Sequence, residues 1–273
     1  MDRELLRLCL ERGDDIIAVR ELVEQGADVN CEGSDGDNYT DTPVTNSILA
    51  GNVKILEYLL KNEADPNYSS SYDLRGTPKF VAMDFNQPEC LAMILATGVE
   101  VNEVTDEHIP DTLLRHAAFH DLPECMSVLL QGGGVDIDKL CGGKTALHVA
   151  TGLRCVSMLL DQGANVNARS SNGGTALWHA ANRGGRFAGD YLQIADLLAR
   201  RGATEDLASN DGRTPMDIAQ SRQFYGYIAR FDKKVRRLPF AQVRHSISQM
   251  IGDTPILRVL QGEDTAWYIK QFL

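Results

Sequence analysis

The chain has 273 residues, an ordinary apolar content of 43% and a net charge of −11. The acidic balance argues against nucleic-acid binding, because surfaces that read nucleic acids are basic. No apolar stretch approaches the ~18 residues that a membrane-spanning helix needs. Residues 1–7 lack the uninterrupted apolar region of a signal peptide. We therefore expect a soluble protein of the cytoplasm, or of the nucleus, that binds neither nucleic acid nor membrane.

A two-part phrase recurs through most of the chain and predicts a solenoid. Its first part begins with a threonine, at Thr42, Thr77, Thr112, Thr145, Thr175 and Thr214, so successive threonines are 35, 35, 33, 30 and 39 residues apart. Its second part is similar to Gly-Ala-Asp-Val-Asn and begins at Gly26, Glu63, Gly98, Gly134, Gly163 and Gly202. A period of this size indicates stacked units that each contact only their neighbours.

Each unit is predicted to hold two short helices. A threonine before proline can cap a helix while the proline occupies the first helical position. In the unit that begins at Thr42, Val44–Ala50 is the first predicted helix and Val53–Lys61 the second, separated by Gly51 and Asn52. The glycine that opens the second part of the phrase suits the left-handed residue after a helix. Glu63 takes that place once, where the helix end should be less favourable.

The phrase resembles the ankyrin repeat, most closely at 145–150 (Thr-Ala-Leu-His-Val-Ala) and 210–219 (Asn-Asp-Gly-Arg-Thr-Pro-Met-Asp-Ile-Ala). The resemblance covers residues 4 to about 221. It implies an all-α fold with short β-hairpin loops, an ankyrin-repeat domain over residues 1–221 and a monomeric chain. It also implies that the chain binds a partner protein through its hairpin tips and the concave side of its first helices.

Candidate partner-binding residues follow from that resemblance. At the ends of first helices they are Asp84, Phe85, Phe119, His120 and Arg183. In the hairpins they are Tyr72 and Arg75 in the second, Asp111 in the third and Lys144 in the fourth. Phe85 and Phe119 either form an exposed aromatic pair or tuck into helix joints. Trp178 replaces the usual histidine of the phrase. It is either an anchor for the partner or packs against the adjacent loop.

The sequence predicts no catalytic residue, no cofactor and no metal site. It has neither a phosphate-binding glycine loop nor a nucleophile turn. His148 lies in the Thr-x-x-His phrase, where the resemblance implies an internal hydrogen bond. Three of the six cysteines, Cys90, Cys125 and Cys155, share one place in consecutive repeats, where Ile55 stands in another repeat. We expect them to be small buried apolar side chains.

Three departures from the repeat pattern are predicted to disturb the stack. Residues 31–40 (CEGSDGDNYT) lengthen the first hairpin with an acidic loop. The fourth repeat is about three residues short between its helices, and the fifth has about six extra residues at 185–190. Because the shortening and the lengthening are adjacent, we expect irregular stacking there.

Residues 222–273 do not repeat. Residues 221–235 and 239–251 are predicted to be helical, and residues 222–245 carry a local charge of +6. This segment is either a helical cap that closes the solenoid or a recruiting box. Residues 238–267 weakly resemble an F-box, and residues 243–252 with the terminal 268–273 weakly resemble a SOCS box. Either box would make the chain a substrate adaptor that binds ubiquitin-ligase subunits.

Overall fold

The computed structural model describes residues 1–11, 13, 15–33, 42–68, 76–105, 110–184 and 189–231. Within these residues the regular elements are helices, and an isolated antiparallel β-bridge joins Cys141 to Lys144. The chain divides into two compact units, Met1–Asn165 and Val166–Leu273.

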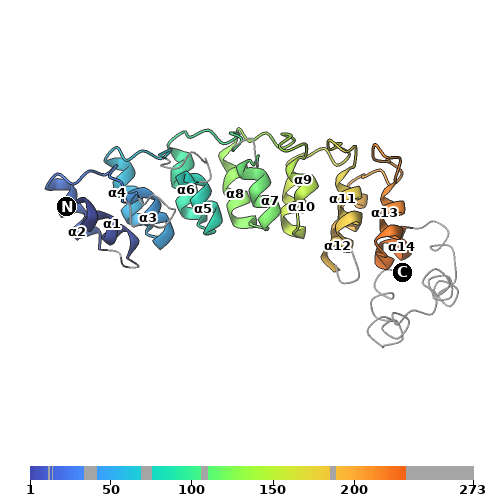
Figure 1. Ribbon diagram of the computed structural model, residues 1–273, viewed down its shortest axis with the longest axis horizontal. Coiled ribbons are helices and arrows are strands. Elements are labelled where there is room, and N and C mark those ends of the chain that lie inside the picture. The colour runs from blue at the N-terminus through green and yellow to red at the C-terminus, as the bar shows by residue number, and fades with distance from the viewer. Residues whose placement is uncertain are drawn as a thin grey trace, which may run out of the picture. The chain divides into compact units, whose positions relative to one another are not determined.

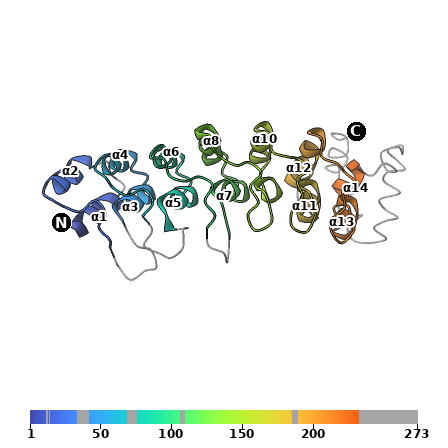
Figure 2. The same cartoon turned by 90° about the horizontal axis from the view of Figure 1, so that it is seen from above.

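The first unit is a stack of five helix pairs (Figure 1). The pairs are α1 (Asp2–Leu10) with α2 (Ile16–Glu24), α3 (Pro43–Ala50) with α4 (Val53–Lys61), α5 (Pro78–Asp84) with α6 (Pro88–Ala96), α7 (Leu113–His120) with α8 (Pro123–Gly132), and α9 (Ala146–Val149) with α10 (Leu153–Asp161). Figure 2 shows α1, α3, α5 and α7 in one row and α2, α4, α6, α8 and α10 in a second row. The predicted bounds of α4 are confirmed, and α3 begins one residue earlier than predicted.

Threonine caps start most of the first helices, as the sequence predicts. The Thr42 hydroxyl accepts a hydrogen bond from the backbone N–H of Thr45, and the Thr45 hydroxyl accepts one from the backbone N–H of Thr42. Pro43 occupies the first position of α3, where its missing N–H costs nothing. In α9, the N–H of Thr145 donates to Nδ1 of His148, so this histidine makes the predicted internal hydrogen bond.

The second helices bury one apolar face against their neighbours. In α4, Ile55, Leu56 and Leu59 are fully buried. Cys90 and Cys125 occupy the place of Ile55 in α6 and α8 and are also fully buried, which confirms their predicted packing role. Burial raises the pKa of both thiols to about 11, so they stay protonated at neutral pH.

Two helix ends depart from the regular repeat pattern. Glu63 has a φ of 65° after α4, where most repeats place glycine, in agreement with the less favourable end predicted there. The predicted shortening of the fourth repeat falls on α9, which has four residues. Thr151, just beyond α9, returns to α7, where its N–H donates to the carbonyl of Ala118 and its hydroxyl to that of Phe119.

The second unit contains α11 (Ala176–Arg183), α12 (Gly189–Arg200), α13 (Pro215–Ser221) and α14 (Tyr225–Phe231). α14 packs on α12 and α13. Tyr227 is buried, and Arg230 forms an ion pair of 2.6 Å with Asp196. Residues 225–231 therefore form part of this unit, and a domain boundary after residue 221 stays a prediction. The predicted helix at 239–251, the recruiting box and most of the extra residues at 185–190 lie outside the described residues.

Candidate functional site

The C-terminal ends of α5 and α7 present two large aromatic side chains to solvent. Phe85 is 53% exposed and Phe119 is 46% exposed, so the alternative in which both rings tuck into helix joints is wrong. Asp84 and His120, beside them, are exposed as well. We call Asp84, Phe85, Phe119 and His120 the first-helix surface.

A buried ionic network lies beneath this surface. His116 of α7 is 3% exposed and lies between two carboxylates. Its Nε2 is 2.9 Å from Oδ1 of Asp84, and its Nδ1 is 3.2 Å from Oδ2 of Asp111. Arg115 donates from Nη1 to the other oxygen of Asp111 at 2.6 Å and to the carbonyl of Pro110 at 3.0 Å. The network therefore joins α5 to α7 through His116.

The network holds His116 in its charged form. Burial alone lowers the pKa of the imidazole, but the hydrogen bond to Asp111 and the ion pair with Asp84 outweigh it and raise the pKa of His116 to about 9. The pKa of Asp111 is lowered in spite of its burial, because it accepts a hydrogen bond from His116 and lies beside Arg115. At neutral pH the buried pair is thus the imidazolium of His116 and the carboxylate of Asp111.

Aromatic contacts continue the network to the exposed rings. The rings of His116 and His120 are 4.4 Å apart between centroids, and Phe119 meets His120 edge-on at 5.0 Å. On its other side, His116 meets the buried ring of Phe80 edge-on at 5.8 Å. A continuous line of contacts therefore runs from Phe119 through two histidines to Asp84, the residue before Phe85.

The short helix α9 belongs to the repeat that follows Phe119. In the fourth repeat the chain turns after Val149, and Gly152 lies directly under Asp121, the residue that follows α7. A Cβ built on Gly152 would come within 1.7 Å of the Asp121 carboxylate, so a larger residue there would displace that side chain. Because of the deletion in the fourth repeat, α9 ends at Val149 after four residues, whereas α7 has eight.

The other predicted site residues lie elsewhere. Trp178 is 6% exposed, and its indole N–H donates to the carbonyl of Arg213 at 3.1 Å, so it packs against the adjacent loop and is not an exposed anchor. Arg183 is half-buried at the end of α11, and Lys144 is half-buried beside Cys141. Tyr72 and Arg75 lie outside the described residues.

Sequence reasoning did not identify the role of His116 and Asp111. Asp111 was expected in a hairpin surface, but it is 4% exposed and belongs to the buried network. The partner of His116 on α5 precedes it by 32 residues, which is about one repeat. Aligning the repeats would have placed the acid at the end of one first helix beside the histidine of the next.

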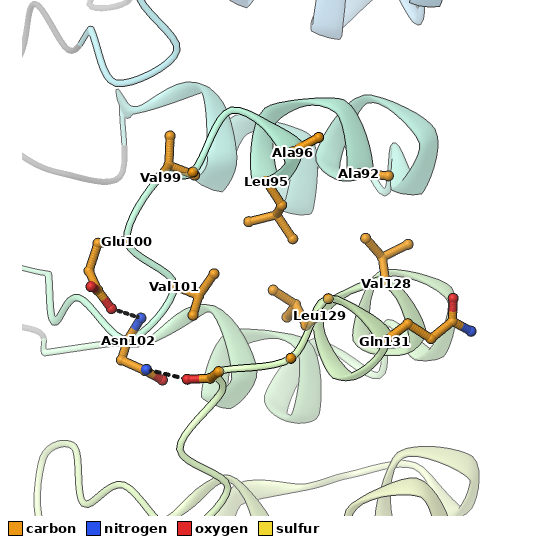
Figure 3. Close-up of a pocket in the computed structure, with 14 residues that line it drawn as sticks. Ala92, Leu95, Ala96, Val99, Glu100, Val101, Asn102, Val128, Leu129 and Gln131 are labelled. Atoms are coloured by element: carbon orange, nitrogen blue, oxygen red, sulfur yellow. Dashed lines mark hydrogen bonds between the residues drawn. The ribbon is translucent and has the colours of Figure 1, made fainter.

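The second helices of the same two repeats line a depression of about 660 Å³ (Figure 3). Its apolar walls come from α6 and α8, and its rim includes Glu100, Asn102 and the glycines 132–134. Asn102 bridges the rim, donating from Nδ2 to the carbonyl of Gly134 at 2.7 Å. After α8 the chain has two glycines of positive φ, Gly133 and Gly134, where α6 is followed by Gly98 alone.

The part of the chain that the structure describes offers no set of three His, Cys, Asp or Glu side chains placed to ligate a metal. None of its helices combines the length and the apolar composition of a membrane span.

These features define the class of protein. A sequence profile of ankyrin repeats (three copies) matches residues 79–170. The crystal structure of the ankyrin repeat domain of Bcl-3, described as a unique member of the IkappaB protein family, superposes with a TM-score of 0.63 at 25% identity, covering 81% of this chain and 96% of that one. The chain therefore contains ankyrin repeats and has the ankyrin-repeat fold.

Curated relatives extend the likeness to sequence. The mouse B-cell lymphoma 3 protein homolog is 26% identical over 230 residues, which cover 69% of this chain and 49% of that protein. Human ankyrin repeat and SOCS box protein 16 is 36% identical over 93 residues, 33% of this chain and 19% of that protein. The chain thus matches about half of the first relative's length and about a fifth of the second's.

Proposed function

We propose that the chain is a non-catalytic interaction scaffold that binds a partner protein through the first-helix surface. The observation that carries the proposal is the exposure of Phe85 and Phe119 at the ends of adjacent first helices. Large aromatic side chains are frequent energetic anchors of protein interfaces. We further propose that it acts in the cytoplasm or nucleus, because its six cysteines are all free and buried.

The side chains under Phe85 and Phe119 favour recognition by a pre-organised surface. His116 fixes the end of α5 against α7 through Asp84. The ring of Phe119 is restricted by its contact with His120, which in turn packs on His116. Binding then costs less conformational entropy, because these side chains of the chain are already ordered before the partner arrives. This argument distinguishes the first-helix surface from exposed apolar residues elsewhere in the first unit, such as Ile17, which is 68% exposed.

The test is capture of partners from cell lysate by the immobilised full chain and by its Phe85→Ala/Phe119→Ala variant. Ile17→Ala is the matched control, since it also removes an exposed apolar side chain of the first unit. Circular dichroism melts establish that all three chains are folded. We expect proteins that the wild type and the control retain and the double variant loses. Identical sets for all three chains would contradict the proposed surface.

A second candidate is a substrate adaptor of a ubiquitin ligase, in which residues 222–273 bind the ligase. The similarity to a protein named for ankyrin repeats and a SOCS box favours it. Its test compares the full chain with a chain that ends at Phe231, because α14 packs on α12 and α13 and a cut after residue 221 would remove it. Loss of ligase subunits from the shorter chain, with other partners kept, supports the adaptor. Equal sets favour a cap.

A further inference from the structure

We propose that the first-helix surface recognises a basic protein segment, and that an arginine or lysine of this segment lies against Phe85 and Phe119 with its charge directed to Asp84 and Asp121. This inference rests on the proposed function and adds the chemistry of the partner to it. Four observations support it: the local charges, the helix ends, the aromatic rings and the charge of the whole first unit.

The exposed charges at the ends of α5 and α7 are acidic. The side chain of Asp84 is 47% exposed, and Asp121 is an exposed residue in the left-handed conformation, with a φ of 53°. The cations nearby are already bound. His116 is buried between Asp84 and Asp111, Arg115 is held by Asp111 and the carbonyl of Pro110, and Arg154 pairs with Glu124 at 2.9 Å.

Helix geometry adds negative potential at the same place. The aligned peptide dipoles of an α-helix give its C-terminal end a partial negative charge, although in α7 the carbonyl groups of Ala118 and Phe119 already accept hydrogen bonds from Thr151. α5 and α7 pack side by side, and the Asp84–His116 contact brings their C-terminal ends together. A cation is stabilised near such ends, whereas an acidic side chain is repelled.

The rings suit a cation as well as an apolar group. A guanidinium or ammonium group over a phenylalanine face is attracted by the ring's electron density, and the methylene stem of the same side chain packs on apolar surface. A purely apolar occupant would remove water from Asp84, whose side chain is 47% exposed beside His116, and this desolvation costs free energy. One basic side chain with apolar neighbours satisfies both the rings and the carboxylates.

The first unit as a whole favours encounter with a basic partner. Residues 1–165 contain 28 aspartates and glutamates against 12 lysines and arginines. An excess of this size creates a negative potential that increases the association rate of cationic partners at low salt. The potential is spread over the unit, so it speeds the encounter, whereas the first-helix surface determines where the basic side chain binds.

The experiment is selection of a phage-displayed library of random peptides on the immobilised full chain in buffer of physiological salt. We expect the selected peptides to carry arginine or lysine beside an apolar residue. Replacing that basic residue by glutamine in a synthetic peptide should weaken binding about tenfold, the magnitude expected of a cation that loses a ring and a carboxylate. Fluorescence anisotropy measures the affinities.

Variants of the chain locate the bound peptide. Phe85→Ala/Phe119→Ala should abolish measurable binding, and Asp121→Asn, which keeps a residue that tolerates the left-handed backbone, should weaken it several-fold. Glu21→Gln removes an exposed carboxylate of α2 and Ile17→Ala removes an exposed apolar side chain there, so both should leave the affinity unchanged.

The outcomes separate this inference from the proposed function. Selected peptides without basic residues, whose binding is lost in Phe85→Ala/Phe119→Ala, would overturn the basic partner and leave the surface in place. Basic peptides that bind the double variant as well as the wild type would contradict both, since charge alone would then explain their selection. Failure to select any peptide whose binding depends on the two rings would also contradict both.

Discussion

The second and third repeats differ sharply between their first-helix ends and their second-helix ends. At the first-helix ends, Asp84, His116 and Asp111 tie α5 to α7 and support exposed aromatic rings. At the second-helix ends, α8 is followed by two glycines of positive φ where α6 is followed by one, and apolar side chains of both helices line a depression whose rim is bridged by Asn102. Both sets of helix ends belong to the same two repeats. Among the described residues, polar contacts join the two repeats on both faces, but only at the first-helix ends do they include a buried ionic network beneath exposed rings.

The greatest loss of stability is expected from a charge placed in the buried contact between α9 and its neighbours. Leu147 lies in α9 and is 4% exposed. Leu147→Asp should destabilise the first unit by more than about 4 kcal/mol, because it buries a charge without a partner. A circular dichroism melt measures this effect. Leu153→Asp is the control, since Leu153 is 38% exposed and should tolerate the charge. Equal melts for the two variants would show that α9 is not packed as described.

The second prediction concerns the ionic network at the first-helix ends, whose contribution to the free energy of unfolding depends on pH. The pKa of His116 is raised from 6.5 to about 9 in the folded chain. Its ionic contribution to stability is therefore complete below pH 6.5 and lost as the pH rises through about 9. His116→Gln should lower the free energy of unfolding by roughly 2–3 kcal/mol at pH 6, a value reduced for the exposure of Asp84.

Urea unfolding of wild type and His116→Gln at several pH values measures this difference. At pH 10 the wild-type imidazole is neutral, and the difference in unfolding free energy should shrink by most of its value at pH 6. A difference that stays constant between pH 6 and pH 10 would mean that His116 contributes by packing with Phe80 and His120, and that its charge adds nothing.

Some features of these repeats could be predicted from the sequence and others could not. The helices could be predicted because their signals are local: Thr42-Pro43 starts α3, and Gly51-Asn52 separates it from α4. The exposure of Phe85 and Phe119 followed from their places at helix ends, although the sequence left the buried alternative open. The ionic network could not be read locally, because Asp84 and His116 belong to different repeats and meet only through stacking.

Trp178 shows the same limit in the second unit. Its place in the phrase allowed either an exposed anchor or a packed side chain. The choice depends on the carbonyl of Arg213, 35 residues later, which accepts the indole N–H. A large polar-tipped ring is buried when such a partner is available, and nothing in the residues around Trp178 reveals that partner.

A smaller effect is expected at the second-helix ends. Gly133 has φ 74° and ψ 173°, a conformation open essentially to glycine alone. Gly133→Ala should therefore destabilise the chain by about 1–2 kcal/mol in a thermal melt. Gly132→Ala is the matched control, because Gly132 is helical and a Cβ there meets no atom within 4 Å. The control should be neutral or slightly stabilising, and equal losses would contradict the strained turn.

The smallest expected effect on stability tests the rigid surface most directly. Phe85→Ala/Phe119→Ala should change the free energy of unfolding by less than about 1 kcal/mol, since each ring already has about half of its surface in water in the folded chain. The pH dependence of unfolding should also stay that of the wild type, because Asp84, His116 and Asp111 are intact. A loss of several kcal/mol would show that the rings belong to the core of the stack. Unchanged stability together with lost peptide binding would separate the contact residues from the ionic network that supports them.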